Sequence, residues 1–166
     1  HCINCNSSKE DTIIRMKKRS ITKYNQFQIV FSIILIDQVS KYFASSFLLD
    51  KNIIFIPHLI QLNLVMNTGA AFSILRDSRI LLSIISLFVS IILFIWVWKN
   101  KYESRWQSIA IPFLLGGTMG NGIDRWRLGY VYDFIELIPV KFPIFNFADI
   151  AINIAILFLA IDFFNK

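Results

Sequence analysis

The residues with the clearest capacity for chemistry are two aspartates in apolar surroundings, Asp133 and Asp149. Asp133 lies in the sequence VYDF, between aromatic residues, and Asp149 ends the sequence FNFAD at the start of a long apolar run. An ionised carboxylate is costly in such surroundings, so it usually has a partner or a chemical role there. Two carboxyl groups that share a semi-apolar site hold one proton between them, because both cannot ionise cheaply.

A carboxyl pair that holds one proton can hydrolyse a peptide bond. The ionised member takes a proton from water while the protonated member polarises the carbonyl group, as in aspartic proteases. The pair forms if the segment that carries Asp133 folds back over the start of the helix that carries Asp149. Two alternatives stay open: a small proton- or ion-coupled membrane transporter that uses the same carboxylates as a relay, and a non-enzymatic membrane scaffold.

The composition indicates a membrane protein. Hydrophobic residues make up 55% of the 166 residues, and 16 residues are phenylalanine. Several apolar runs approach the roughly 20 helical residues that cross a bilayer core. The sequence predicts four transmembrane helices, at about 24–41, 80–98, 106–125 and 145–164. The run at 80–98 is the clearest, because it contains no charged residue and ends in tryptophans suited to the membrane interface.

The basic residues predict the orientation. Lysine and arginine are frequent before the first span and between the second and third spans. By the positive-inside rule these segments, and with them both termini, are cytoplasmic. The net charge of +6 has its excess in the N-terminal arm, where anionic lipid headgroups account for it. We therefore expect membrane lipids, and no nucleic acid, as partners of this arm.

Residues 1–15 differ in sequence character from the rest of the chain, and Met16 resembles a natural start. We interpret them as a disordered remnant or an over-extended N-terminus, outside a single membrane domain at 16–166. Cys2 and Cys5 are the only cysteines. A single pair at this spacing, with no second pair, does not favour a zinc site. The sequence thus predicts neither a metal site nor a disulfide framework.

Two segments are expected outside the membrane, on the extracytoplasmic side. In the region 49–79, apolar and polar residues alternate from Ile60 to Met66, which predicts a strand, and IIFIP before it is a plausible partner strand. These elements indicate a small β-sheet cradle on the membrane surface. The segment 127–143 is aromatic, contains two prolines and is too short and too charged to cross a bilayer.

Further polar residues are expected at the same membrane level as the two aspartates. Asp37 and Lys41 are spaced i, i+4 with the acid first, the favourable order for an ion pair, so a purely structural pair is an even alternative to a role in a site. Asn121 and Arg125 have the same spacing, and Asn146 lies on one helical face with Asp149.

Structural interpretations compete at other positions. Asp124 beside Arg125 is interpreted as a structural or orienting pair, and Asn67 could simply end a strand. Gly116 and Gly120 form a GxxxG pattern, which lets a neighbouring helix approach closely. Asp162, near the cytoplasmic end of the last span, is expected to meet water.

Five sequence blocks, in this order, resemble the motif set of the bacterial lipoprotein signal peptidase (signal peptidase II) family. They are DQVSK at 37–41, NTGAAFS at 67–73, GGTMGNGIDR at 116–125, VYDF at 131–134 and FPIFNFAD at 142–149. The resemblance extends from about Met16 to the C-terminus. It implies a membrane aspartic endopeptidase with four transmembrane helices and a small extracytoplasmic sheet, located in the bacterial cytoplasmic (inner) membrane.

The resemblance also implies a substrate and a set of site residues. The expected reaction removes the signal peptide from a diacylglyceryl-modified prolipoprotein by a cut before the lipid-bearing cysteine, near the extracytoplasmic surface. Asp133 and Asp149 map onto the catalytic dyad, no metal or organic cofactor is implied, and we expect a monomer. The residues expected to bind the substrate or support the dyad are Asp37, Lys41, Asn67, Gly69, Asn121, Arg125 and Asn146.

Overall fold

The computed structural model describes residues 21–49, 51–69 and 79–165. Its helices are α2 (Lys23–Phe47), α3 (Arg79–Lys99), α4 (Arg105–Leu128) and α5 (Phe147–Phe164), and its strands are β1 (Ile53–Ile56), β2 (Ile60–Asn67) and β3 (Val131–Leu137). The interpretation of residues 1–15 and the part of the NTGAAFS block at 70–73 lie outside the described residues.

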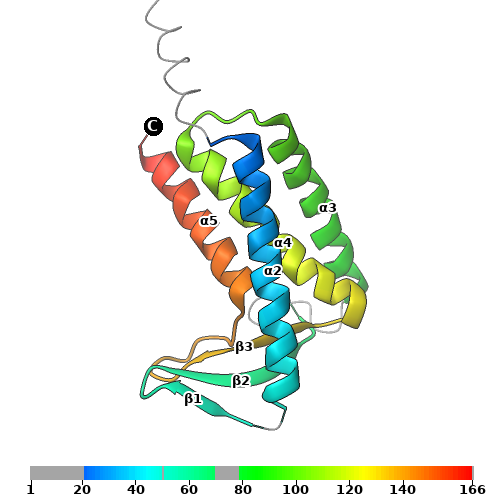
Figure 1. Ribbon diagram of the computed structural model, residues 1–166, viewed down its shortest axis with the longest axis vertical. Helices are drawn as coiled ribbons and strands as arrows, with labels where there is room; N and C mark the ends of the chain where they lie inside the picture. The colour runs from blue at the N-terminus through cyan, green and yellow to red at the C-terminus, as the bar shows by residue number, and fades with distance from the viewer. Residues whose placement is uncertain (1–20, 50, 70–78, 166) are drawn as a thin grey trace, which may run out of the picture.

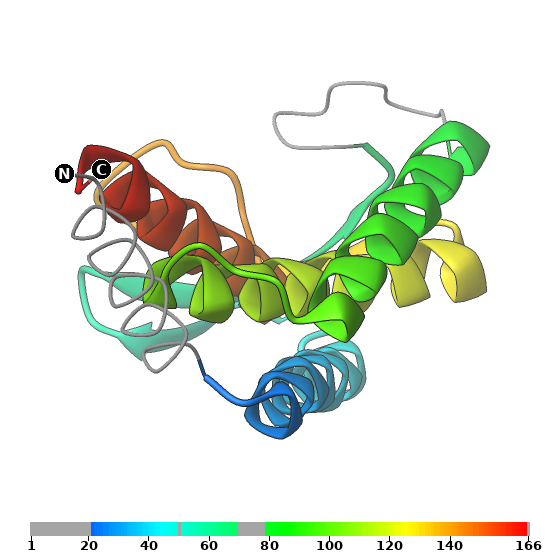
Figure 2. The same ribbon diagram turned by 90° about the horizontal axis from the view of Figure 1, so that it is seen from above.

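Helix α4 is the centre of the bundle. It packs against α2, α3 and α5, and Figure 2 shows it between them in the view from above. The three-stranded sheet lies at one end of the bundle, while the start of α2, the end of α5 and the α3–α4 connection lie at the other (Figure 1). Over the described residues, the helices α2, α3, α4 and α5 run between these two ends, and the sheet lies at one of them.

Among the described residues, three helices are long and apolar enough to cross a membrane: α2, α3 and α5. They leave large apolar side chains exposed, such as Phe31, Ile84 and Leu157, as expected where lipid surrounds the helices. The third predicted span, at 106–125, is helical, but α4 is not among the helices that are long and apolar enough. Its glycines and Asp124 are buried inside the protein rather than exposed to lipid, so the sequence of α4 has less need to be apolar.

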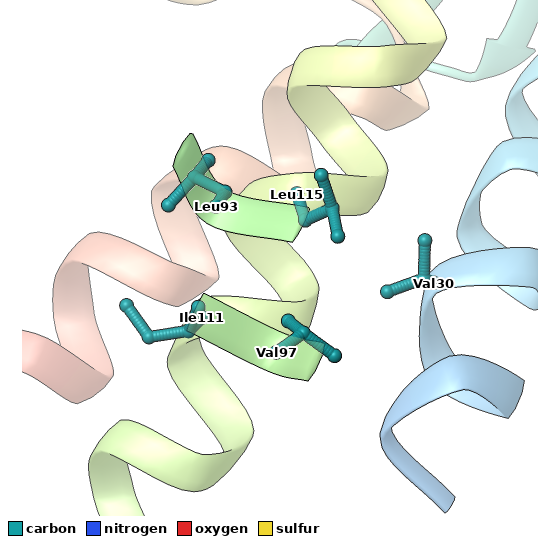
Figure 3. Packing of buried hydrophobic residues seen from close by; sticks show 5 residues of the cluster. All are labelled: Val30, Leu93, Val97, Ile111 and Leu115. Atoms are coloured by element: carbon teal, nitrogen blue, oxygen red, sulfur yellow. The ribbon is translucent and has the colours of Figure 1, made fainter. Parts of the chain in front are cut away.

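An apolar cluster joins three of the helices in the half of the bundle away from the sheet. Val30 of α2, Leu93 and Val97 of α3, and Ile111 and Leu115 of α4 are buried together (Figure 3). In Figure 3 the side chains of Val97 and Leu115 point toward Val30 across the space between the helices. The polar residues that are hydrogen-bonded to Asp133 of β3 lie nearer the sheet.

The sheet confirms the predicted pair of strands and adds one that was not predicted. β1 and β2 pair antiparallel, and His58, with a φ of 61°, lies in the tight connection between them. β3 pairs with the other edge of β2, so that Val65 lies opposite Asp133. The 127–143 segment thus contains a strand, which charged residues in VYDFIEL had obscured in the sequence pattern.

Asp162 is buried, although we expected it to be exposed to water. Only 5% of the residue is exposed, and its Oδ2 accepts a hydrogen bond of 2.8 Å from Gln107 Nε2. The prediction that it simply meets water was wrong, because the start of α4 packs over the end of α5 and supplies an amide donor.

The glycines of α4 confirm the predicted close helix approach. A Cβ atom at Gly116 would lie 2.9 Å from Ile33 Cβ of α2, and one at Gly120 would lie 2.7 Å from Asp37 Oδ2. Gly117 faces the other way, where a Cβ would lie 2.5 Å from the backbone oxygen of Ala148. α4 can touch α2 and α5 at once only because these positions lack side chains.

We expect Gly117→Ala to lower the thermal unfolding temperature in detergent micelles. The new methyl group would press on the Ala148 backbone and the Ile152 side chain, and overpacking of this kind costs about 1–3 kcal/mol. Gly122→Ala is the control, since its methyl group would meet only Ser86 Cβ at 3.5 Å and would gain up to about 1 kcal/mol of helix propensity. Equal unfolding temperatures for the two variants would contradict the packing argument.

Candidate active site

A buried lysine anchors one side of the polar region. Lys41 Nζ lies 2.8 Å from Asp37 Oδ2 and 2.8 Å from Asp124 Oδ2, and all three residues are at most 3% exposed. The contact with Asp37 is also a hydrogen bond, whereas the contact with Asp124 is an ion pair without hydrogen-bond geometry. Asp37 Oδ1 accepts the backbone N–H of Ala148 at 3.0 Å, so this cluster joins α2, α4 and α5.

Asn121 connects Lys41 to Asp149, one of the two aspartates of the predicted pair. Its Oδ1 accepts a hydrogen bond of 2.9 Å from Lys41 Nζ, and its Nδ2 donates to Asp149 Oδ1 at 2.8 Å. The same Oδ1 accepts from Asn146 Nδ2 at 3.1 Å. One amide side chain on α4 therefore bridges α2 and the start of α5.

Asn146 connects the two aspartates. It is the N-cap of α5: its Oδ1 accepts the Asp149 backbone N–H at 3.0 Å, and its own backbone N–H donates to Asp149 Oδ2 at 3.1 Å. Its Nδ2 donates to Asp133 Oδ1 at 2.6 Å. This capping box satisfies backbone donors that α5 would otherwise leave unpaired, and it brings Asp133 of β3 and Asp149 of α5 to opposite sides of one residue.

The end of β2 completes the surroundings of Asp133. Asn67 Nδ2 donates to Asp133 Oδ2 at 2.8 Å, while Asn67 Oδ1 accepts the backbone N–H of Gly69 at 2.9 Å. Arg125 Nη2 reaches the backbone oxygen of Gly69 at 3.3 Å. Asn67 thus ends the strand, as one interpretation held, and also contacts a carboxyl group.

The two carboxyl groups differ in their exposure to solvent. Asp133 is 3% exposed, whereas Asp149 is partly exposed. Burial raises the pKa of Asp133 to about 6, the hydrogen bond from Asn67 acts in the opposite direction, and the charge of Asp149 adds to the rise. Asp133 is therefore suited to keep a proton in conditions where an ordinary aspartate has lost it.

The structure brings together all nine predicted site residues. Asp133 and Asp149 meet at Asn146, and the supporting residues make the contacts described above, with Gly69 joined to the group through Arg125. The predicted pair of Asp124 with Arg125 was wrong, because Asp124 lies against Lys41 of α2 while Arg125 bonds to the backbone of Gly69 and Asn121.

Sequence reasoning missed one residue of this network. Gln38 Nε2 donates to Asp124 Oδ1 at 3.0 Å and lies 3.3 Å from Asp37 Oδ2. The residue stands inside the DQVSK block, so its position next to Asp37 was the available signal. Its amide bridges two carboxylates that Lys41 alone does not fully satisfy.

The comparisons with known proteins give this arrangement a family. A family model described as "Signal peptidase (SPase) II" matches residues 29–165. The chain belongs to the signal peptidase II family. The lipoprotein signal peptidase of Parasynechococcus marenigrum (strain WH8102) is 52% identical over 135 residues, which cover 81% of this chain and 85% of the relative. That of Pseudomonas fluorescens (strain Pf0-1) is 42% identical over 142 residues, which cover 81% and 84%.

A solved structure supports the same assignment at the level of the fold. A bacterial membrane enzyme determined by the in meso method superposes with a TM-score of 0.78 at 30% identity, covering 85% of this chain and 88% of that chain. This member of the signal peptidase II family is thus a membrane peptidase with apolar helices and a small antiparallel sheet.

The raised pKa of Asp133 predicts a pH-dependent stability. Because the folded-state pKa of about 6 lies above the ordinary value of 3.8, ionisation of Asp133 costs more in the folded state than in the unfolded state. Its contribution is fully present below about pH 4 and is lost as the pH rises through 6, an effect of roughly 3 kcal/mol. We expect Asp133→Asn to flatten this part of the curve of unfolding temperature against pH.

Glu136→Gln is the matched control for this measurement. It removes another carboxyl group from the same strand, one that accepts hydrogen bonds from Gln61 and Asn63, and it leaves Asp133 in place. The control should keep the native pH dependence between pH 4 and 7. A native curve that is flat over this range would show that Asp133 does not hold a proton in the folded state.

Proposed function

We propose that this chain is an aspartic endopeptidase that removes the signal peptide from diacylglyceryl-modified prolipoproteins and cuts on the amino side of the lipid-bearing cysteine. The names of its relatives, lipoprotein signal peptidases, support the substrate class. The observation that carries the proposal is the position of Asp133 and Asp149. Both carboxyl groups bind Asn146, and each accepts hydrogen bonds on both of its oxygens, which holds the pair in a defined geometry.

The chemistry of the pair is general acid–base hydrolysis of the scissile amide. A water molecule held by the two carboxyl groups loses a proton to the ionised carboxylate and attacks the carbonyl carbon. The protonated carboxyl gives its proton to the carbonyl oxygen, which forms a neutral tetrahedral diol. The diol then collapses and the carbon–nitrogen bond breaks. The protonated carboxyl group gives its proton to the amine of the cysteine, and the other carboxylate takes a proton from a diol hydroxyl group, so that the pair again holds one proton.

The supporting residues position the pair and the substrate backbone. A peptide bond brought to membrane depth must have its polar groups satisfied, because no bulk water is available there. Arg125 donates a hydrogen bond to the backbone oxygen of Gly69 and interacts with the charges of Asp133 and Asp149, so it holds Gly69 beside the carboxyl groups. Asn67 and Gly69 lie where an extended substrate could run along the end of β2.

The location follows from the same arrangement. All four helices cross the bacterial cytoplasmic membrane in this proposal, α4 included, since the other three surround its polar residues. Both termini are cytoplasmic, and the sheet end lies at the extracytoplasmic surface, where the lipid-bearing cysteine of a prolipoprotein is presented. The substrate's acyl chains stay among the membrane lipids, and the enzyme acts as a monomer.

We expect Asp133→Asn and Asp149→Asn each to reduce cleavage of a diacylglyceryl-modified prolipoprotein by about 10³-fold or more, because either change removes the acid or the base. The measurement is product formation by purified, folded protein in detergent. Glu136→Gln, on the same strand as Asp133, should retain activity, and so should the native enzyme in EDTA. Full activity in either folded aspartate variant would show that Asp133 and Asp149 are not a catalytic pair.

We expect the activity to fall as the pH rises through about 6, when Asp133 of the free enzyme loses its proton. Asn67→Ala removes a hydrogen bond that lowers the pKa of Asp133, so it should move this basic limb of the profile of kcat/KM against pH to higher pH. Asn63→Ala is the control, since Asn63 lies on the same strand and binds Glu136 instead. Unmoved basic limbs in both variants would argue that Asp133 is not the acid.

A further inference from the structure

The side chain of Asn121 can take only one orientation in this network. Lys41 is a donor and has no acceptor, so Asn121 must turn its oxygen toward Lys41, where the two atoms lie 2.9 Å apart. Its amide nitrogen must then face Asp149, at 2.8 Å from Oδ1. Asp37 and Asp124, each 2.8 Å from Lys41 Nζ, hold the ammonium group in place.

The surroundings of Asp149 favour a negative charge. Besides Asn121 Nδ2, its carboxyl group accepts the backbone N–H of Asn146 at 3.1 Å. It also lies in the first turn of α5, where the helix dipole favours an anion.

The surroundings of Asp133 favour a proton. The residue lies on a strand, not within the first turn of a helix as Asp149 does, and only 3% of it is exposed. Its carboxyl group accepts hydrogen bonds from two amide N–H groups, as the carboxyl group of Asp149 does, so the number of hydrogen bonds alone does not distinguish the two groups. The deeper burial of Asp133 and the place of Asp149 in the first turn of α5 do distinguish them.

We propose that Lys41, acting through the amide of Asn121, makes Asp149 the ionised member of the pair and leaves the shared proton on Asp133. This inference rests on the proposed function, because it assigns roles within that pair. Asp149 then takes the proton from water, and Asp133 gives its proton to the scissile carbonyl oxygen. Lys41 is a positioning residue, since it touches neither the water nor the two reacting carboxyl groups.

All charged groups near Asn121 and the pair enter this balance. They come from every described element packed there. Helix α2 contributes Asp37 and Lys41, α4 contributes Asp124 and Arg125, β3 contributes Asp133, and α5 contributes Asp149. The Lys41 charge also lowers the pKa of Asp133, so its selective effect on Asp149 passes through Asn121. Asn121 Oδ1 accepts from Lys41 Nζ and from Asn146 Nδ2, while its Nδ2 faces Asp149.

The test compares Lys41→Met and Lys41→Arg by the pH dependence of kcat/KM on a diacylglyceryl-modified prolipoprotein. Without the ammonium group, Asn121 Oδ1 keeps only the donor Asn146 Nδ2 at 3.1 Å, so the orientation that gives Asp149 an N–H donor is held less firmly and ionisation of the base becomes less favourable. We expect Lys41→Met to move the acidic limb of the profile up by about one pH unit. Lys41→Arg keeps a cationic donor and should leave the limb near its native position. Lys101→Met, an exposed lysine of the α3–α4 connection, is the control.

A double-mutant cycle tests whether the effect passes through Asn121. If it does, Lys41→Met combined with Asn121→Ala moves the acidic limb no further than Asn121→Ala alone. Additive shifts would show that Lys41 acts on the pair by charge alone, which would overturn the proposed route. An unmoved acidic limb in folded Lys41→Met, with only a lower kcat or unfolding temperature, would reduce Lys41 to a structural role.

A second readout does not depend on the folding of the Lys41 variants. In infrared spectra of the protein labelled with ¹³C-aspartate, recorded near pH 5, the protonated-carboxyl band of the pair should disappear in Asp133→Asn and persist in Asp149→Asn. The reverse result would overturn the assignment even if both variants are inactive. Activity retained in these two variants would instead remove the dyad itself, so the two failures are distinguishable.

Discussion

The structure depends on the cost of placing polar groups where water cannot reach them. A buried donor or acceptor without a partner costs about 1–3 kcal/mol, and an unpaired charge costs more. The bundle meets this constraint by directed contacts that run from Lys41 through Asn121 to Asp149, and from Asn146 to Asp133. Each of these amides uses both its oxygen and its nitrogen, so few alternative arrangements are available.

This constraint explains why the carboxyl groups lie at a helix start. Asn146 and Asp149 form a capping box, which would stabilise the first turn of α5 in any protein. Here the box also presents the free amide hydrogens of Asn146 to Asp133 on β3. The same contacts therefore begin the helix and join both carboxyl groups to Asn146.

Close packing of α4 is the second requirement. A network with hydrogen bonds of about 3 Å between α2, α4 and α5 needs backbones that approach closely, and Gly117 and Gly120 permit this approach. The apolar cluster around Leu115 fixes the other half of the bundle. α4 therefore combines a packing half and a polar half, which is why it is the least apolar of the four helices and why the other three surround it.

The sequence by itself determined the membrane class, the three apolar helices, the β1–β2 pair and the set of polar residues that meet at the sheet end. These features leave local signals: apolar runs, alternation, and acids in apolar surroundings. Only the tertiary structure decided that VYDFIEL is a strand paired with β2, that Asp124 faces Lys41 rather than Arg125, and that Asp162 is buried against Gln107. Those outcomes depend on which elements pack together, and neighbours in space that are far apart in the chain leave no periodic trace in a single sequence.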